Sequence, residues 1–239
     1  MNHLIVSGAL TNATRDQDGS VKGTLTFHFP KWDKALQREV PSPATVDVFL
    51  SQRVMQLVEL TGKKVSTEGM TLLVEGNFDI SKAQGSPEQY LLYASNVTPL
   101  GVGVECHVNT ILLAGNIGQD PEIKYFESGQ QQAKFSLATK KNVKDADKPD
   151  WHSVQAIGKS AEFVGAHLPK GSTVSVRGVL VEEAWSDKST GAPRRKFVVK
   201  LDRINPLGKK DANSNGGGNQ YATAGATSAP APYDPLDDF

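Results

Sequence analysis

The chain has 239 residues, with 26 lysines and arginines against 26 aspartates and glutamates, so its formal charge is zero. Since domains usually have about 100–200 residues, this length predicts one large domain or two small ones. The single cysteine, Cys106, excludes an internal disulfide framework and a structural zinc site made of several thiolates. The apolar runs are too short for a membrane-spanning helix, and the N-terminus lacks the basic and apolar pattern of a secretory signal. We therefore expect a cytoplasmic protein that does not associate with membranes.

The zero net charge is the sum of three unlike segments. Residues 1–103 carry a net charge of −1, residues 104–208 carry +3, and residues 209–239 carry −2. The last segment contains a glycine run at 216–218, several prolines and few apolar side chains, so little in it offsets the entropy lost on ordering. We expect it to be a disordered C-terminal tail. A neutral total argues against a nucleic-acid-binding protein, but here it hides a mildly basic middle segment.

The part of the chain before the tail contains an internal repeat. Three pairs of short segments match in the same order, two at an offset of 107 residues and one at an offset of 102: 4–10 with 111–117, 96–101 with 203–208, and 73–78 with 175–180. Different loop lengths account for the difference between the offsets. The repeat predicts a duplicated domain, one copy in residues 1–103 and the other in residues 104–208.

Each copy shows the same series of predicted elements, five strands with a helix between the third and the fourth. In the first copy the strands are 4–10, 24–29, 45–50, 70–78 and 89–98, and the helix is 52–60. In the second copy the strands are 111–117, 133–139, 151–157, 172–185 and 195–205, and the helix is 160–168. This is the plan of the OB-fold, and Gly8, Gly76, Gly115 and Gly178 suit the bends of its strands. We therefore predict an all-β fold with two five-stranded OB-fold barrels in tandem, followed by the tail.

The second copy carries motifs in a specific order. They are VNTILLAGNIGQDPEIKY at 108–125, FSLAT at 135–139, WHSV at 151–154, VRG at 176–178 and WSD at 185–187. In this order and spacing they resemble the bacterial single-stranded DNA-binding protein (SSB) family, over nearly all of residues 107–208. The resemblance implies a non-enzymatic protein that binds and protects single-stranded DNA with little sequence preference in replication, recombination and repair. It also implies that the protein lies at the nucleoid.

Trp151 and Trp185 are the main candidates for stacking on DNA bases. Stacking on an aromatic ring is worth about 1–3 kcal/mol per base and tolerates any base sequence. The alternative is that both rings pack in the barrel core, as large aromatic side chains often do. Trp151 alternates with Ser153, Gln155 and Ile157 on the more polar face of its strand, which together with the family resemblance favours an exposed ring.

Two further aromatic residues are candidate DNA contacts. Phe126, Tyr125, Phe135 and Phe197 are expected in the core or at the rim of the barrel rather than in stacking, but Phe126 has the best claim to a DNA contact among them because it follows a turn. Trp32, in the first copy, lies among basic residues, a mixture that suits single strands. No motif distinguishes a structural role from a binding role for Trp32.

Basic residues gather in two predicted loops of the second copy. The candidate phosphate contacts are Lys140, Lys141, Arg194, Arg195 and Lys196. Flexible basic loops beside aromatic platforms follow a phosphate backbone. The alternative is an ordinary solvated loop, because aspartates lie among the lysines and because the arginine cluster faces the glutamates at 182–183 across the predicted hairpin.

Catalytic chemistry has no recognisable signature in the chain. His152 is one of five histidines, none of which has a partner at a spacing typical of metal ligands, and we expect it to be buried or at an interface. We recognise no nucleophile with its base, no paired carboxylates and no phosphate-binding glycine loop. We therefore predict no catalytic residue, no metal site, no cofactor and no enzyme.

The C-terminal tip resembles the acidic tips of SSB proteins. It ends in Asp237, Asp238 and Phe239, although the family usually has a proline where this chain has Asp238. The resemblance implies a docking peptide for replication and repair proteins, whose carboxylates pair with basic residues and whose phenylalanine fills an apolar pocket. The alternative is an ordinary solubilising terminus.

Two barrels per chain imply a homodimer that presents four barrels, as in the two-barrel members of the family. Two other readings stay open at this point. The barrels belong to a replication or recombination accessory that mainly holds protein or RNA, or they are substrate-binding appendages of an enzyme. The second alternative is disfavoured because the two barrels and the tail account for every residue.

Overall fold

The computed structural model describes residues 1–65, 69–81, 88–140 and 149–208. The predicted tail with its acidic tip and the candidate Lys141 lie outside the described residues. The first half contains β1 (Asn2–Arg15), β2 (Val21–Asp33), β3 (Arg38–Leu50), α1 (Gln52–Leu60), β4 (Met70–Ser81) and β5 (Gln89–Val102). The second half contains β6 (Asn109–Ile117), β7 (Glu122–Tyr125), β8 (Gln131–Thr139), β9 (Asp150–Ile157), α2 (Lys159–His167), β10 (Thr173–Ser186) and β11 (Pro193–Pro206).

The strands close into two rings of the same topology. The first runs β1–β2–β3–β5–β4 and back to β1, and the second runs β6–β8–β9–β11–β10 and back to β6. Neighbours are antiparallel except for β3 with β5 and β9 with β11, which are parallel; the long connection that a parallel pair needs is in each case a helix followed by another strand. The predicted fold of two five-stranded OB-fold barrels is confirmed. The short strand β7, which extends the hairpin before β8, was not predicted.

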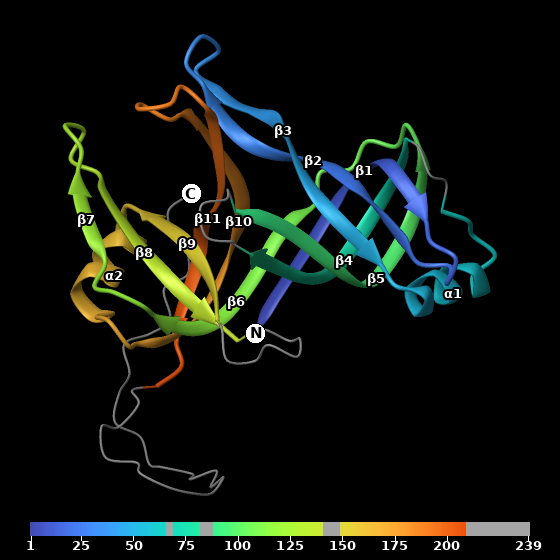
Figure 1. Ribbon diagram of the computed structural model, residues 1–239. Coiled ribbons are helices and arrows are strands. Elements are labelled where there is room, and N and C mark those ends of the chain that lie inside the picture. Colours follow the sequence, from blue (N-terminus) through green and yellow to red (C-terminus); the bar gives the residue numbers. More distant parts are fainter. Residues whose placement is uncertain (66–68, 82–87, 141–148, 209–239) are drawn as a thin grey trace, which may run out of the picture.

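Strand β1 of the first barrel pairs with strand β6 of the second, so that both barrels share one 11-stranded sheet (Figure 1). Leu4 lies opposite Ile111, its own counterpart at the offset of 107 residues. An approximate twofold axis therefore passes through this pair. The helices α1 and α2 lie at opposite ends of the molecule in Figure 1, and neither is long and apolar enough to cross a membrane, nor is any other helix among the described residues.

Two buried asparagines make equivalent contacts, each between two strands of its own barrel. The amide of Asn2 bonds both the carbonyl and the N–H of Phe78 in β4. Asn109, 107 residues later, donates to the Leu180 carbonyl at 2.8 Å and accepts from the Leu180 N–H at 3.0 Å in β10. A buried side-chain amide satisfies peptide groups that would otherwise be lost from pairing at this point. The repeat in the sequence is thus a repeat of polar contacts as well.

Glycines Gly76 and Gly178 occur at the same irregularity of the two barrels. The registers of β4 with β5 and of β10 with β11 each shift by one residue at these glycines. A Cβ atom would overlap the carbonyl oxygen of Tyr93 at Gly76 and that of Lys200 at Gly178. These are the bends that the strand glycines predicted, since only glycine allows such a close backbone approach.

An aromatic cluster fills the space between the barrels. Phe197 of β11 packs against Phe78 and Tyr90 of the first barrel, with ring centroids 5.6 and 4.7 Å away. The Tyr90 hydroxyl donates to Glu88 and accepts the N–H of Phe197. Phe135 and Phe197 are buried, as predicted, and so is His152, which lies 6.3 Å from the Phe78 ring.

Candidate nucleic-acid interface

Trp151 lies exposed on strand β9, on the outer face of the second barrel. The pleat of β9 turns Trp151, Ser153 and Ile157 outwards, and the Trp151 side chain is 52% exposed. Its ring lies on Gly118, where a Cβ atom would overlap the ring atoms. Gln155 shares this face but is covered because its amide donates to Glu183 at 2.8 Å. The sequence prediction of an exposed Trp151 is confirmed.

Trp185 lies near the tip of the β10–β11 hairpin, opposite Arg194 in the strand register. It is 47% exposed, as predicted. Asp187 shapes the tip: its carboxylate accepts the Ser189 hydroxyl at 2.6 Å and the backbone N–H groups of Ser189 and Thr190. These bonds, led by that of the Ser189 hydroxyl, hold the pKa of Asp187 well below its usual range. The hairpin therefore presents Trp185 from a turn with fixed hydrogen bonds.

The three basic residues of this hairpin pair with carboxylates of the same hairpin: Arg194 with Asp187 at 3.5 Å, Arg195 with Glu182 at 3.2 Å, and Lys196 with Glu183 at 3.3 Å. Burial acts to raise the pKa of Glu183. Hydrogen bonding from Gln155 and the charge of Lys196 outweigh this effect, so the pKa lies below its usual value. Solvent-exposed ion pairs of this kind contribute little to stability, so their cations remain able to exchange partners.

The strand registers show which residue of the first barrel stands where Trp151 stands in the second. Two residues after each bulge glycine, the same three-strand row crosses the barrel: Phe78–Leu92–Val48 in the first and Leu180–Val199–Val154 in the second. The third member of the row is Val48 in the first barrel and Val154 in the second. Three residues before it lies Thr45 in the first barrel and Trp151 in the second. One residue before it lies Asp47 in the first barrel and Ser153 in the second. The first barrel therefore has neither the aromatic ring nor the neutral neighbour at these places.

Arg195 of the second barrel covers the Thr45 position. Its guanidinium Nη1 donates to both the carbonyl and the hydroxyl oxygen of Thr45, each at 3.0 Å. The hairpin of the second barrel thus leans on the strand of the first barrel that corresponds to β9. Sequence reasoning missed this contact because it joins residues 150 positions apart.

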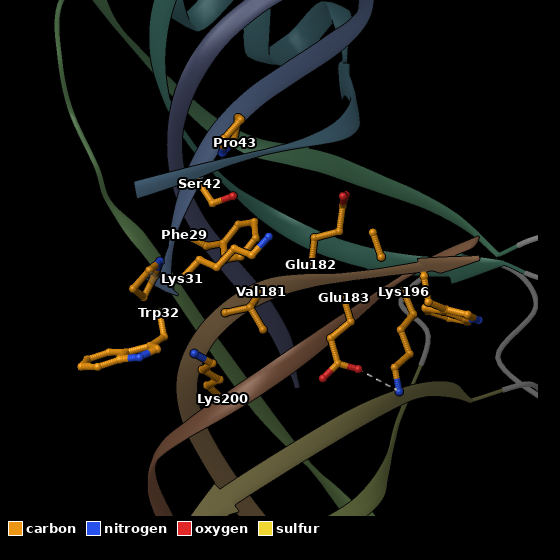
Figure 2. Close-up of a pocket in the computed structure, with 13 residues that line it drawn as sticks. Phe29, Lys31, Trp32, Ser42, Pro43, Val181, Glu182, Glu183, Lys196 and Lys200 are labelled. Atoms are coloured by element: carbon orange, nitrogen blue, oxygen red, sulfur yellow. Dashed lines mark ion pairs between the residues drawn. The ribbon is translucent and has the colours of Figure 1, made fainter. Parts of the chain in front are cut away.

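The β2–β3 hairpin of the first barrel projects beside the β10–β11 hairpin of the second (Figure 1). A groove with a volume of about 770 Å³ runs between them, and its lining includes both Trp32 and Trp185 (Figure 2). Trp32 is 54% exposed, while Lys31, Lys196 and Lys200 also line the groove. The structure therefore brings together two tryptophans that are far apart in the sequence.

The β7–β8 hairpin carries Phe126 in its turn. Phe126 donates its N–H to the Gln130 carbonyl at 2.9 Å, is 38% exposed, and has the Lys124 ammonium 5.2 Å from its ring centroid. The prediction for Tyr125 was wrong: it is 70% exposed rather than in the core or at the rim, because it lies on β7, a strand paired only at one edge with β8. An exposed aromatic and a neighbouring cation suit a nucleic-acid contact.

The model of the single-strand binding protein family matches residues 108–207. Single-stranded DNA-binding protein 1 of Synechocystis sp. is 39% identical over 115 residues, which cover 95% of that protein and 48% of this chain. The single-stranded DNA-binding protein of Thermosynechococcus vestitus is 34% identical over 109 residues, 90% of its length. The chain belongs to the single-strand binding protein family.

Solved structures extend the likeness of fold to both barrels. The wild-type single-stranded DNA binding protein from Thermus aquaticus superposes with a TM-score of 0.63 at 21% identity, over 90% of this chain and 97% of that one. A deletion mutant of the same protein gives a TM-score of 0.65. At this identity the likeness shows the fold alone, which is that of a family member with two barrels.

Two exposed lysines lie on or directly after β8, the strand that pairs with β9. Lys140, a predicted contact, is exposed just after β8. Lys134 is exposed opposite Gln155 and adds to the positive potential at Glu183. Sequence reasoning did not single out Lys134, although its place between the buried residues Ala133 and Phe135 shows that it points outwards.

His152 is buried beside the Thr139 hydroxyl, 3.1 Å from its Nε2 atom. Burial lowers the pKa of His152 to about 4, so the ring is neutral at pH 7. Among the described residues, no three histidine, cysteine, aspartate or glutamate side chains come together as a metal site.

Proposed function

We propose that this protein binds single-stranded DNA without catalysis, and that Trp151 is its central stacking residue. The observation that carries the proposal is the exposed Trp151 ring, which lies against Gly118 at the outer face of β8 and β9. In OB-folds this face and the hairpins beside it bind oligonucleotides. The relatives that match the second barrel are named single-stranded DNA-binding proteins.

The side chains around Trp151 suit a binding mode with little sequence preference. Phe126 and Trp185 offer further rings on the hairpins to either side, and every base has a face on which to stack. Lys134 and Lys140 supply cations on the face, and Arg194 and Lys196 exchange their hairpin carboxylates for phosphates. Affinity should therefore fall with salt, by about 0.7 in log K per unit of log salt for each phosphate neutralised.

Arg195 has a different role in this proposal. Its guanidinium is held by Thr45 and Glu182, so it positions the β10–β11 hairpin and contacts phosphate only at the edge of that hairpin. The hydrogen bonds to Thr45 join the two barrels, and the hairpin that they hold carries Trp185.

The proposed biological setting is protection of single strands during replication, recombination and repair in the nucleoid. Asp237, Asp238 and Phe239 would recruit proteins of these processes. Each chain has two barrels, in residues 1–103 and 104–208. Two chains would assemble as a homodimer with four barrels. Light scattering of the full chain tests the assembly, and a monomer mass at working concentration would contradict it.

The DNA proposal is tested by tryptophan emission during titration with poly-dT. We expect the emission of the full chain to be quenched in proportion to occupancy, and double-stranded DNA of the same length to quench far less. Unchanged emission and unchanged anisotropy of a labelled strand would contradict the proposed function.

A second candidate role applies to the first barrel alone, which would hold protein or RNA rather than DNA. Asp47 stands on its face where the second barrel has Ser153, and Asp16 and Asp18 line the same hollow. The full chain with Trp151→Ala and Trp185→Ala separates the two roles. Complete loss of DNA binding by this variant favours the accessory role, whereas residual binding that falls further when Trp32→Ala is added assigns DNA binding to the first barrel.

A further inference from the structure

We propose that the groove between the β2–β3 and β10–β11 hairpins carries a single strand from the second barrel onto the first, with Trp32 as the stacking residue of the first barrel. This inference rests on the proposed DNA-binding function and adds a path and a second barrel to it. The groove is built from both barrels, so neither barrel forms it alone.

The groove continues the Trp151 face through direct contacts. Gln155 lies on the outer face of β9 and donates to Glu183, which lines the groove. Lys200, another lining residue, lies beside Gln155 in the parallel pairing of β9 with β11. A strand that leaves Trp151 along β9 therefore reaches the groove without crossing a gap in the surface.

The groove combines aromatic rings with cations. Trp32 and Trp185 are both about half exposed there, and Phe29, Pro43 and Val181 add apolar surface to the lining. Exposed rings take bases at their faces, and an apolar floor favours base or sugar over water. Figure 2 shows the side chains of Trp32 from β2 and Lys200 from β11 near each other in the view.

The charge of the groove suits phosphate. Its two glutamates already have partners, since Glu182 pairs with Arg195 and Glu183 with Lys196. Lys31 and Lys200 form no ion pair with any residue that the structure describes. Two cations are therefore left for a bound polyanion between the two tryptophans.

The first barrel has no better place for the strand on its own outer face. The position that corresponds to Trp151 is Thr45, and Arg195 covers it. Asp47 and Asp18 line the hollow farther along that face, where they repel phosphate, while Asp16 in the same lining is paired with Lys22 at 2.7 Å. The hairpin that carries Trp32 is the part of the first barrel that the second barrel's hairpin adjoins.

A protein with Trp32 as its sole tryptophan tests the proposal directly. The full chain with Trp151→Phe and Trp185→Phe keeps aromatic rings at both positions. We expect poly-dT to quench its emission, with anisotropy of a labelled strand recording occupancy in the same sample. A bound strand with unchanged Trp32 emission would overturn the groove proposal. If the wild-type chain binds no strand at all, the DNA-binding function itself is wrong.

Removing the Trp32 ring gives an independent test with a matched control. Trp32→Ala should weaken binding of a long dT strand about 5-fold or more, because one stacked base is lost, and should leave binding of a strand short enough for the Trp151 face unchanged. Leu36→Ala removes an exposed apolar side chain from the same hairpin, outside the groove lining, and should change neither. Equal affinities of Trp32→Ala and wild type for the long strand would overturn the proposal.

The cations give a third readout. Lys31→Gln together with Lys200→Gln should lower the salt slope for the long strand by about 1.4, since each lost phosphate contact accounts for about 0.7. An unchanged slope would contradict the placement of phosphates in the groove.

Discussion

The two barrels share a backbone plan and differ in what they present on one face. Both have a bulge glycine, a buried asparagine and the same three-strand row at corresponding places. On the third strand, however, the second barrel presents Trp151 and Ser153, whereas the first presents Thr45 and Asp47. The shared backbone geometry requires the glycines and the buried asparagines, so both barrels keep them. The fold does not constrain the exposed side chains, so these differ between the barrels.

The difference also has a structural use. In the first barrel the Thr45 position accepts two hydrogen bonds from Arg195, so the face that corresponds to the proposed DNA-binding face of the second barrel supports the second barrel's hairpin. In the proposed division, the outer face of the second barrel holds the strand, and the corresponding face of the first barrel positions the second barrel's hairpin.

The largest effect is expected from glycines that the two barrels share. Gly8→Ala and Gly115→Ala each drive a Cβ atom into a backbone carbonyl, that of Thr26 in the first barrel and that of Ala138 in the second. Backbone has to shift in both, and we expect each to lower the free energy of unfolding by about 3 kcal/mol. Chemical denaturation measures this.

A matched control is Gly118→Ala. Its Cβ atom would meet the ring of Trp151 rather than backbone, so the ring moves and the barrel stays folded. We expect this variant to lose DNA affinity with little loss of stability. A loss of stability as large as that of Gly115→Ala would show that Gly118 is a backbone requirement and not a seat for the ring.

The next largest effect separates the third strands. Trp151→Ala should weaken poly-dT binding by about 1–3 kcal/mol, or roughly 5- to 150-fold, because a stacking platform is lost. Thr45→Ala, the corresponding change in the first barrel, keeps the backbone carbonyl that Arg195 contacts and should change affinity little. Fluorescence anisotropy of a labelled strand compares them. Equal losses for both variants would contradict the division between the barrels.

A pH effect distinguishes the barrels through His152, whose place in the first barrel is taken by the buried Val46. The unfolded chain has the ordinary histidine pKa of 6.5, and burial lowers the pKa of the folded state to about 4. As pH falls below 6.5 the unfolded state takes up the proton first, so stability is lost until the folded ring is protonated near pH 4. From pH 7 to pH 5 this amounts to about 2 kcal/mol.

The contribution is isolated by comparing the wild type with His152→Gln, using denaturation at both pH values. The difference between pH 7 and pH 5 should shrink by most of that amount in the variant. An identical pH dependence in both proteins would show that the pKa of His152 does not differ between the folded and unfolded states.

The smallest effect comes from the charge beside the stacking position. Ser153→Asp brings a carboxylate to the DNA face and should weaken binding several-fold at low salt, less at high salt, through repulsion of phosphate. Asp47→Ser should change affinity little, because the first barrel's outer face does not hold the strand in this account. A larger effect of Asp47→Ser than of Ser153→Asp would reverse the roles of the two faces.

Local patterns predicted much of the fold. Two-residue alternation placed Phe135 inside and Trp151 outside, and the bounds predicted for α1 agree with the structure because a strand ends directly before it and a glycine turn follows it. The repeated glycines predicted equivalent bends, which the bulges at Gly76 and Gly178 confirm. These features depend on residues close together in the chain.

Features that join distant segments could not be predicted in this way. The pairing of β1 with β6 uses strand edges, whose peptide groups are the same in every sequence. The contact of Arg195 with Thr45 and the shared groove of Trp32 and Trp185 follow from that pairing. By contrast, the sequence predicted the ion pairs of the β10–β11 hairpin, because a hairpin places its opposite charges across from each other.

The central claim is that a bound strand lies on β9 of the second barrel and not on the corresponding strand β3 of the first. Ultraviolet crosslinking of a bromouracil-substituted strand to the full chain, followed by peptide mapping, tests it most directly. Aromatic side chains are available on both faces, Trp151 on the second barrel and Tyr93 on the first. We expect adducts on the peptide that carries Trp151 and none on the peptides that carry Thr45 or Tyr93. Adducts on the first barrel's face without any at Trp151 would contradict the account.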